Sequence, residues 1–411
     1  MGIYVNPGNQ AFKEAVNSRI YVDKSELIHY TNSVLNTQQK HMCVSRPRRF
    51  GKSMAADMLV AYYSKGCDSR ELFSTLKIAR EHPDTSAAKQ YHSHLNQHHV
   101  IRFDVQRFLF DETHVYIFIQ KIQEAVIREL YIEFKDFLDS THTPDPYGLP
   151  GILAQIYAQT GNRFIIIIDE WDCVFRLAKE NVEIQKKYLN FLRGLFKGSE
   201  YIDFAYMTGI LPIKKYGEHS AINIFDEYSV TDPKNLCEYF GFTKKEVQEQ
   251  CIKYHVDFAG MEKWYDGYQL GNFHIYNPKS VADALTWKKF KSYWTGTETY
   301  EALKIYIERN YDGLREAVIE MLGGGQCRID PTTFQNDMTT FHTKDDVLTL
   351  LVHLGYLTYH EQSNHVFIPN LEIAQEFIRA IKIGGWGNHK ILLSLTNPLW
   401  IRPETIDPIT G

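Results

Sequence analysis

The sequence lacks the features that mark membrane, secreted and strongly basic proteins. No apolar run approaches the roughly 18 residues that a transmembrane helix needs, and the polar N-terminal segment contains no apolar stretch like that of a signal peptide. The six cysteines form no CxxC pair, which favours reduced thiols over disulfides or a zinc site. A formal net charge of −5 argues against a broadly basic nucleic-acid-binding surface. We therefore expect a cytoplasmic chain that neither crosses nor binds a membrane.

The chain does contain enough apolar side chain to build a core. Hydrophobic residues make up 44% and charged residues 23% of its 411 positions, as is usual for globular proteins. At about 150 residues per domain, this length predicts two to three domains. Apolar runs alternate with helical stretches through the first 230 residues, which predicts an α/β domain with a parallel sheet. Its strands are expected at 41–45, 100–104, 164–168 and 203–208, and its helices at 52–64, 113–138, 152–160 and 184–197.

The pattern changes after about residue 232. Thr243 and Glu246 form the two ends of a capping box that opens a helix. Further along, an apolar-faced helix at 345–354 is followed by two short apolar segments across a polar turn. A helix followed by a hairpin predicts a module resembling a winged helix.

The strongest chemical signal is the segment SRPRRFGKS at 45–53, which follows a predicted strand and opens a predicted helix. Gly51-Lys52-Ser53 matches the second half of the P-loop pattern, in which amides at a helix N-terminus bind phosphate oxygens. Lys52 is expected to reach the β- and γ-phosphates, and the Ser53 hydroxyl to ligate Mg²⁺. The pattern has Gly where Arg46 stands, so the match is partial. The predicted nucleotide-binding set is Arg48, Arg49, Phe50, Gly51, Lys52, Ser53 and Met54 on the loop and helix, with Asp23 before the first core strand.

Two later strand ends carry polar groups that complete this chemistry. A run of five apolar residues at 164–168 ends in Asp169 and Glu170, the Walker B pattern of a strand buried on both faces. Asp169 is expected to hold Mg²⁺ with Ser53, and Glu170 to polarise the attacking water as general base. Thr208 ends a further strand, where it could sense the γ-phosphate or position water; a simple strand-end turn is the alternative.

Several short motifs together resemble one family. They are YVDKS at 21–25, RPRRFGKS at 46–53, IIIIDEWD at 165–172, Thr208-Gly209, WYDGY at 264–268, YNPKS at 276–280 and FIPN at 367–370. From about residue 5 to 386 the chain is similar to the predicted AAA-ATPase-like proteins of bacteria and archaea. The resemblance implies an ASCE-type P-loop ATPase core, with ATP and Mg²⁺ as ligands, followed by helical and winged-helix-like parts. An arginine-rich loop without the first glycine is usual there, so Arg46 does not count against ATP binding.

The resemblance also suggests how the chain divides. We expect an AAA-like P-loop ATPase domain at 1–232, a helical lid-like region at 233–300, a winged-helix-like module at 301–386 and an atypical tail at 387–411. The family commonly ends in a PD-(D/E)xK nuclease-like domain. No Asp followed by an E-x-K strand is found after residue 386, so nuclease activity is not expected of this chain.

Some residues carry a functional and a plainer interpretation side by side. Asp23 could help to cover the adenine or form a solvated charge pair with Lys24, and Arg193 could be an arginine finger or a surface ion-pair partner. Asp172 could support the site or stabilise the start of a helix. The histidines between residues 92 and 99 could bind a metal, although a solvated polar loop is the simpler interpretation.

The function predicted from these patterns is Mg²⁺-dependent ATP hydrolysis that drives a conformational switch, read by a protein partner or a second copy of the chain. Two alternatives stay open. One is a nucleotide-binding interaction protein that hydrolyses little. The other is an ATPase that works with a nuclease partner on nucleic acid.

Overall fold

A computed structural model of the chain describes residues 2–80, 86–109, 114–138, 147–213, 222–294, 311–334, 341 and 343–383. Their contacts divide the chain into two compact units. The first unit comprises Met1–Arg46 and Gly51–Ser229, and the second comprises Pro47–Phe50, Val230–Phe334 and the chain from Phe341 onward. The predicted tail at 387–411 and part of the predicted lid-like region, 295–300, lie outside the described residues.

A five-stranded parallel sheet organises the first unit. Its strands are β1 (His41–Ser45), β2 (His99–Asp104), β3 (Phe164–Asp169), β4 (Ile202–Gly209) and β5 (Asp226–Tyr228). They are arranged in the order β2-β3-β4-β1-β5, and every pairing is parallel. β4 therefore lies between the strand that leads into the P-loop and the strand that ends in the acidic pair. The predicted α/β domain with a parallel sheet is confirmed.

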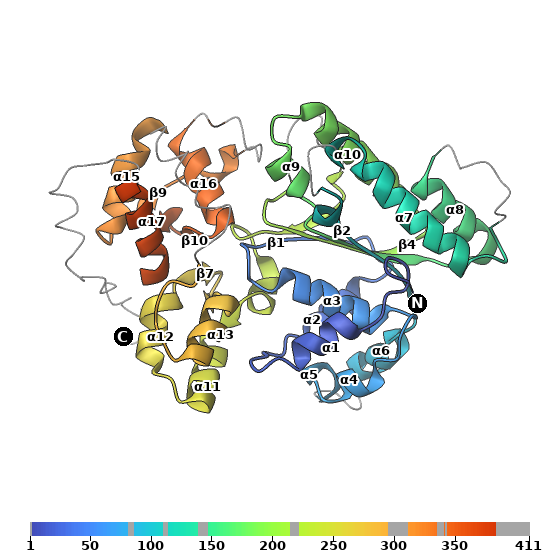
Figure 1. Ribbon diagram of the computed structural model, residues 1–411, viewed down its shortest axis with the longest axis horizontal. Helices are drawn as coiled ribbons and strands as arrows, with labels where there is room; N and C mark the ends of the chain where they lie inside the picture. The colour runs from blue at the N-terminus through green and yellow to red at the C-terminus, as the bar shows by residue number, and fades with distance from the viewer. Residues whose placement is uncertain are drawn as a thin grey trace. The chain divides into compact units, whose positions relative to one another are not determined.

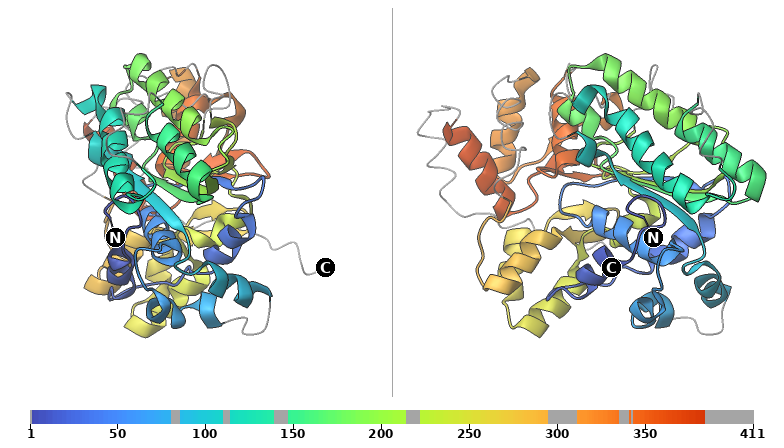
Figure 2. Two further views of the ribbon diagram at one scale, coloured as in Figure 1. Left: turned by 90° about the vertical axis from the view of Figure 1, so that its right-hand side faces the viewer. Right: turned by 45° about the vertical axis from the view of Figure 1, so that its right-hand side comes forward.

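Helices cover both faces of this sheet. They are α1 (Gln10–Val16), α2 (Leu27–Val34), α3 (Lys52–Tyr63), α4 (Arg70–Ser74), α5 (Lys77–Arg80), α6 (Ser86–His94), α7 (Phe118–Glu133), α8 (Leu149–Thr160), α9 (Cys173–Leu177) and α10 (Val182–Phe196), with the short 3₁₀ turns η1 (Val105–Phe108) and η2 (His114–Tyr116). Helices α1, α2 and α3 lie on one face and α7 to α10 on the other (Figure 1). Figure 2 shows the same layers from two further directions.

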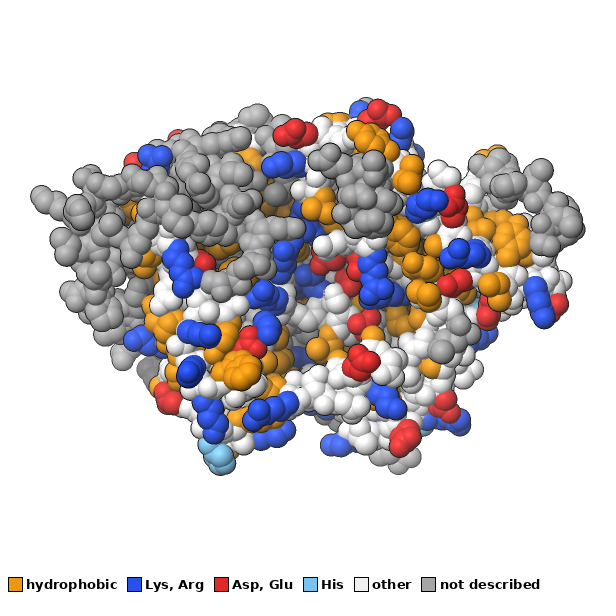
Figure 3. Space-filling view, viewed as in Figure 1, with side chains coloured by type: hydrophobic (Ala, Val, Ile, Leu, Met, Phe, Trp, Pro, Cys, Tyr) orange, Lys and Arg blue, Asp and Glu red, His pale blue; other side chains and the backbone are white. Residues whose placement is uncertain are grey.

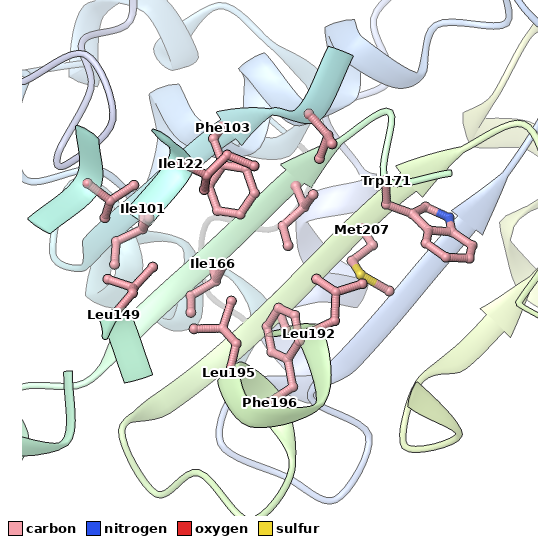
Figure 4. Packing of buried hydrophobic residues seen from close by; sticks show 14 of the residues in the cluster. Ile101, Phe103, Ile122, Leu149, Ile166, Trp171, Leu192, Leu195, Phe196 and Met207 are labelled. Carbon is pink, nitrogen blue, oxygen red and sulfur yellow. The ribbon is translucent and has the colours of Figure 1, made fainter. Parts of the chain in front are cut away.

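The core of the first unit forms where α7, α8 and α10 pack on the sheet. All six residues of β3 are buried, as expected for a central strand covered by helices on both faces. Ile166 and Met207 on the sheet meet Ile122, Leu149 and Leu192 on the helices (Figure 4). Burying an aliphatic side chain of this size contributes about 1.5–3 kcal/mol, so this layer holds the strand ends in fixed register.

The described part of the second unit contains two three-stranded sheets, with strand orders β6-β8-β7 and β10-β11-β9. Its helices are α11 (Lys244–Tyr254), α12 (Phe258–Tyr265), α13 (Pro278–Trp287), α15 (Leu314–Leu322), α16 (Lys344–Leu354) and α17 (Leu371–Ile383), with 3₁₀ turns η4 (Lys234–Tyr239), η5 (Tyr311–Gly313) and η6 (Pro331–Thr333). Its strands are β6 (Phe242–Thr243), β7 (Tyr268–Leu270), β8 (Phe273–Tyr276), β9 (Cys327–Arg328), β10 (Thr358–His360) and β11 (His365–Phe367).

Local signals explain two of these elements directly. The predicted capping box is confirmed at the start of α11, because the Thr243 side chain accepts from the amide of Glu246 and the Glu246 carboxylate accepts from the amide of Thr243. The predicted helix near 345–354 is α16, and it is followed by the antiparallel pair β10 and β11. Among the described residues, no helix combines the length and the hydrophobicity needed to cross a bilayer.

Candidate nucleotide site

The P-loop connects β1 to the N-terminus of α3. Gly51 stands at the N-cap of α3 with φ 89°, a left-handed conformation that glycine adopts without a steric penalty. Within the described part of the chain, no side chain caps this helix. The first amides of a helix have no partner inside the helix, and its dipole favours negative charge there. The start of α3 is therefore built to accept an anion such as a phosphate.

Lys52 is buried under its own loop. Its side chain is only 4% exposed, and its Nζ donates to the carbonyl oxygen of Arg46 at 3.0 Å. Burial lowers the pKa of Lys52, while the nearby carboxylates of Glu170 and Asp169 act in the opposite direction. The lysine therefore lies near the acidic pair at the end of β3, and its contact with the phosphates stays a prediction.

Arg46, which stands where the P-loop pattern has glycine, points into the protein interior. Its guanidinium is fully buried and donates through Nη1 to the carbonyl oxygens of Ser45 at 2.8 Å and Tyr228 at 2.7 Å. Tyr228 ends β5, the strand next to β1. The side chain thus tethers the start of the loop to the edge strand, which leaves the departure from the P-loop pattern compatible with a phosphate site.

Asp169 ends β3 with a side chain that is almost fully buried, at 2% exposure. Burial raises the pKa of Asp169, whereas a hydrogen bond with the Ser53 hydroxyl and the charge of Arg102 lower it. Arg102 Nη2 lies 3.8 Å from Asp169 Oδ2 and 3.0 Å from Asp57 Oδ1. The Ser53 hydroxyl is near enough to Asp169 to lower its pKa, and the role of these two residues as magnesium ligands stays a prediction.

Glu170 continues from Asp169 in a left-handed conformation, with φ 53°. Its amide donates to Asp169 Oδ1 at 3.1 Å, so the turn that follows β3 is closed by the carboxylate before it. Burial raises the pKa of Glu170, and the charge of Lys52 lowers it. A carboxylate with a raised pKa is a stronger base, which suits the predicted role of activating water.

Thr208 lies at the same edge of the sheet as the P-loop and the acidic pair. In the register of β4 it faces Asp169 on β3 and Val44 on β1. Its side chain is fully buried, and its Oγ1 has no hydrogen-bond partner among the described residues. An unsatisfied buried hydroxyl costs about 1–3 kcal/mol, so Thr208 offers a hydrogen-bonding group at this edge of the sheet that no described residue uses.

The donor set fits Mg²⁺. Ser53 is exposed and has a hydroxyl oxygen, and the nearby Asp169 has a carboxylate oxygen. Mg²⁺ prefers oxygen ligands and usually combines one or two carboxylates with waters and substrate phosphates. Among the described residues, no group of three or more His, Cys, Asp or Glu side chains could hold a metal. A magnesium ion here would therefore depend on the phosphates of a nucleotide for its remaining ligands.

The tip of the loop, Pro47–Phe50, belongs to the second unit by its contacts. Arg49 has φ 70°, and its Nη1 donates to the carbonyl oxygen of Tyr293 at 2.8 Å. The carbonyl oxygen of Phe50 accepts from the amide of Gly241 at 3.0 Å. The rings of Phe50 and Tyr268 pack edge to face, with their centroids 5.1 Å apart. Arg48 is partly buried. The predicted phosphate contacts of Arg48 and Arg49 are not tested by this arrangement.

Three further candidates have other surroundings. Both carboxylate oxygens of Asp23 accept backbone amides, those of Ser25 at 2.8 Å and Lys77 at 2.7 Å, which fixes the start of α5. Met54 is 44% exposed on the first turn of α3. Arg193 lies exposed in the last turn of α10. The chain continues from there to the start of β4, which is at the opposite end of the strand from the P-loop. That placement does not favour Arg193 as a finger for its own P-loop.

Sequence reasoning missed Arg176, which is buried beside the acidic pair. Its Nη2 donates to Glu170 Oε2, and its Nε donates to Asp172 Oδ2 at 3.1 Å. Asp172 stands at the N-cap of α9 without making a capping hydrogen bond, so it lies at a helix start as expected and also pairs with Arg176. The spacing of Asp172 and Arg176, four residues apart, is the signal that could have identified the pair.

A polar cleft of about 720 Å³ lies at the opposite edge of the sheet, where β2, β3 and β4 begin. Lys65, Arg163 and Asp203 line it. His98 also lines it and contacts Asp203 at 3.6 Å and His94 at 3.0 Å. The cleft is separated from the P-loop by the length of the strands, so it is not part of the nucleotide site.

The chain is similar to a curated bacterial protein. It is 25% identical over 293 residues to a protein of Azotobacter chroococcum mcd 1 described as "Uncharacterized protein in vnfD 5′ region". The match covers 68% of this chain, and the chain spans only 51% of that relative's length.

Two solved structures show a distant likeness. Cdc6p of Pyrobaculum aerophilum is 11% identical with a TM-score of 0.32, the match covering 92% of this chain and 99% of that one. The ORC2 protein of Aeropyrum pernix, solved as ADPNP and ADP complexes, is 10% identical with a TM-score of 0.35, the match covering 89% and 97%. These scores are too low to support any statement about ligands or partners. The sequence model of one family, described as Predicted AAA-ATPase, matches residues 7–217, which is more than half of the chain. The chain therefore belongs to the predicted AAA-ATPase family.

Proposed function

We propose that this protein binds ATP together with Mg²⁺ and hydrolyses it. The observation that carries the proposal is that the Ser53 hydroxyl lies near enough to the Asp169 carboxylate to lower its pKa, while the charges of Glu170 and Asp169 act on the buried Lys52. Lys52 and Ser53 come from the start of α3, which follows β1, and Asp169 and Glu170 come from the end of β3. In the sheet, β4 lies between β1 and β3. The four side chains supply the phosphate-binding cation, the oxygen ligands for a metal and a base within one small region.

Each residue has a defined task in this proposal. The amides at the start of α3 and the Lys52 ammonium bind the phosphates, which positions the terminal phosphate beside the end of β3. Ser53 and Asp169 hold Mg²⁺, which supplies charge neutralisation to the phosphates when bound. Glu170 accepts a proton from the attacking water. Thr208 donates its free hydroxyl to the terminal phosphate or to that water.

Hydrolysis would act on the second unit through the loop itself. Pro47–Phe50 is packed with the second unit, while Gly51 and Lys52 belong to the first. The carbonyl of Phe50 is held by the amide of Gly241, and Arg49 is held by Tyr293. Phosphate that reorganises the loop would therefore change contacts that belong to the second unit. A protein partner or a second copy of the chain would respond to that change, as in other nucleotide-driven switches.

Substituting Glu170 tests hydrolysis separately from binding. E170Q keeps the shape of the side chain but removes the base, so phosphate release should fall by about 10²-fold or more while ATP affinity changes little. Lys187, exposed on α10 and paired with Glu183, provides a control in K187A, which should leave both quantities unchanged. Equal turnover in the wild-type protein and E170Q would refute the assignment of the base. Negligible turnover in the wild-type protein, with ATP binding intact, would support the interaction protein that hydrolyses little.

Duplex DNA added to the same assay tests the remaining alternative. Lys and Arg side chains are mixed with Asp and Glu on the face of the molecule shown in Figure 3, as far as its residues are described. With a net charge of −5, such a surface gives little long-range attraction for a polyanion. We expect no stimulation of turnover by DNA. Stimulation that falls steeply with added salt would instead favour an ATPase acting on nucleic acid.

A further inference from the structure

A chain of buried polar contacts runs from Glu170 to the segment that follows β4. Arg176 donates to the carboxylate of Glu170 and, through Nε, to Asp172 Oδ2 at 3.1 Å. The same Oδ2 accepts the amide of Leu211 at 2.9 Å. The side chains of Arg176 and Asp172 are 8% and 0% exposed, so water competes little for these bonds.

We propose that Arg176 is a positioning residue that fixes the Glu170 carboxylate beside Lys52 and ties it to the backbone that follows Thr208. This inference rests on the proposed function, in which Glu170 acts as the base. The planar guanidinium presents several N–H donors in a fixed arrangement, so it can hold two carboxylates at once and in one orientation.

The need for such a residue follows from the place of Glu170. Glu170 lies just past the end of β3, where no ladder hydrogen bond restrains it and its backbone is left-handed. Its flexible side chain would otherwise sample several rotamers. A base must lie within hydrogen-bonding reach of the water it activates, and a displacement of about 1 Å can cost about 10²-fold in rate.

Asp172 packs tightly against the end of β4. A Cβ added to Gly209 would come within 2.5 Å of Asp172 Oδ1 and 2.8 Å of the Trp171 ring, so the backbone of β4 lies directly against the Asp172 carboxylate. The amide of Trp171 also donates to the carbonyl oxygen of Thr208 at 3.0 Å. A movement at the end of β4 is therefore transmitted to Asp172, to Arg176 and so to the base.

Substitution of Arg176 tests the proposal, with two readouts. R176A leaves the buried Asp172 carboxylate unpaired and could prevent folding, so R176K is measured beside it. Lysine keeps the charge but cannot hold two carboxylates in the same fixed geometry. We expect kcat for phosphate release to fall about ten-fold or more in R176K, and further in R176A if it folds. The dissociation constant of ATP should stay within about three-fold of the wild-type value. K187A, at an exposed lysine of α10 that pairs with Glu183, should change neither quantity.

The second readout needs neither nucleotide nor turnover. Hydrogen exchange at the Leu211 amide should become at least about ten-fold faster in R176K, because the carboxylate that accepts this amide is less firmly held. Folded variants that keep kcat within two-fold of the wild-type value would overturn the proposal. So would an equal loss of kcat and ATP affinity, which indicates general damage. If the wild-type protein does not hydrolyse ATP, the proposed function fails by itself, and unchanged exchange at Leu211 would then overturn the Arg176 link independently.

Discussion

Glu372 should make the stability of the second unit depend on pH. It lies at the start of α17 and is only 1% exposed. Its Oε1 accepts the amide of Tyr293 at 2.6 Å, and its Oε2 accepts the Ser280 hydroxyl at 2.8 Å. The carbonyl of Tyr293 in turn accepts the Arg49 guanidinium at the P-loop tip. Burial raises the pKa of Glu372 from the usual 4.5 to about 7, although these hydrogen bonds act in the opposite direction.

The sign and size of the effect follow from this shift. The folded state binds the proton of Glu372 more tightly than the unfolded state does, so the resulting stabilisation is complete below pH 4.5 and is lost as the pH rises through 7. Each pKa unit corresponds to about 1.4 kcal/mol, which gives about 3 kcal/mol between the two limits. E372Q is neutral at every pH and can still accept the amide of Tyr293. It should therefore be more stable than the wild-type protein by about 2–3 kcal/mol at pH 8, and nearly equal to it at pH 4.5.

Urea unfolding at pH 4.5, 6, 7 and 8 measures this difference, and hydrogen exchange at the Tyr293 amide assigns it to the second unit. E262Q is the matched control, because Glu262 pairs with Lys244 at the surface of the same unit at 2.7 Å. An exposed pair of this kind contributes about 0–1 kcal/mol. A stability difference between E372Q and the wild-type protein that is the same at pH 4.5 and pH 8 would refute the reasoning.

Two further substitutions test the site and the packing of the first unit. T208V removes a buried hydroxyl that has no partner among the described residues. Thermal unfolding should therefore show equal stability or a gain of up to about 1 kcal/mol, while the rate of phosphate release falls about ten-fold. Lower stability with unchanged turnover would contradict the proposed role of Thr208. E129A removes a carboxylate that accepts the three consecutive amides of Ile3–Val5, and urea unfolding should show a loss of about 2 kcal/mol. E124A, on the exposed side of the same helix, should lose less than about 0.5 kcal/mol, and equal losses in the two variants would argue against the N-terminal contact.

The central strands and the P-loop helix could be predicted because their signals are local. Five consecutive apolar residues before Asp169, four of them β-branched, predict a strand buried on both faces, and β3 covers Phe164–Asp169. The predicted strand at 41–45 is β1 without change, and the helix predicted from Lys52 begins there because Gly51 alone tolerates the left-handed N-cap. These elements are specified by neighbours in the sequence, so the sequence alone reveals them.

Other features depend on partners far along the chain. β5 has only three residues, Asp226–Tyr228, and forms because the edge of β1 offers free backbone groups. Its polar residues give no strand signal. The packing of Phe50 with Gly241 joins positions 191 residues apart, which no local pattern indicates. The same holds for Asp23, because nothing near it in the sequence shows that its carboxylate accepts the amide of Lys77.

The measurement that tests the central claim most directly is titration of the wild-type protein and K52A with ATP, with and without Mg²⁺. The claim is that the start of α3 binds the phosphates of ATP, with Lys52 and a metal held by Ser53 and Asp169. It predicts binding that is strengthened by Mg²⁺ in the wild-type protein and reduced at least about 100-fold in K52A, with K65A, at a lysine of the opposite cleft, unchanged. Equal ATP affinity in K52A and the wild-type protein, or affinity that does not respond to Mg²⁺, would contradict it.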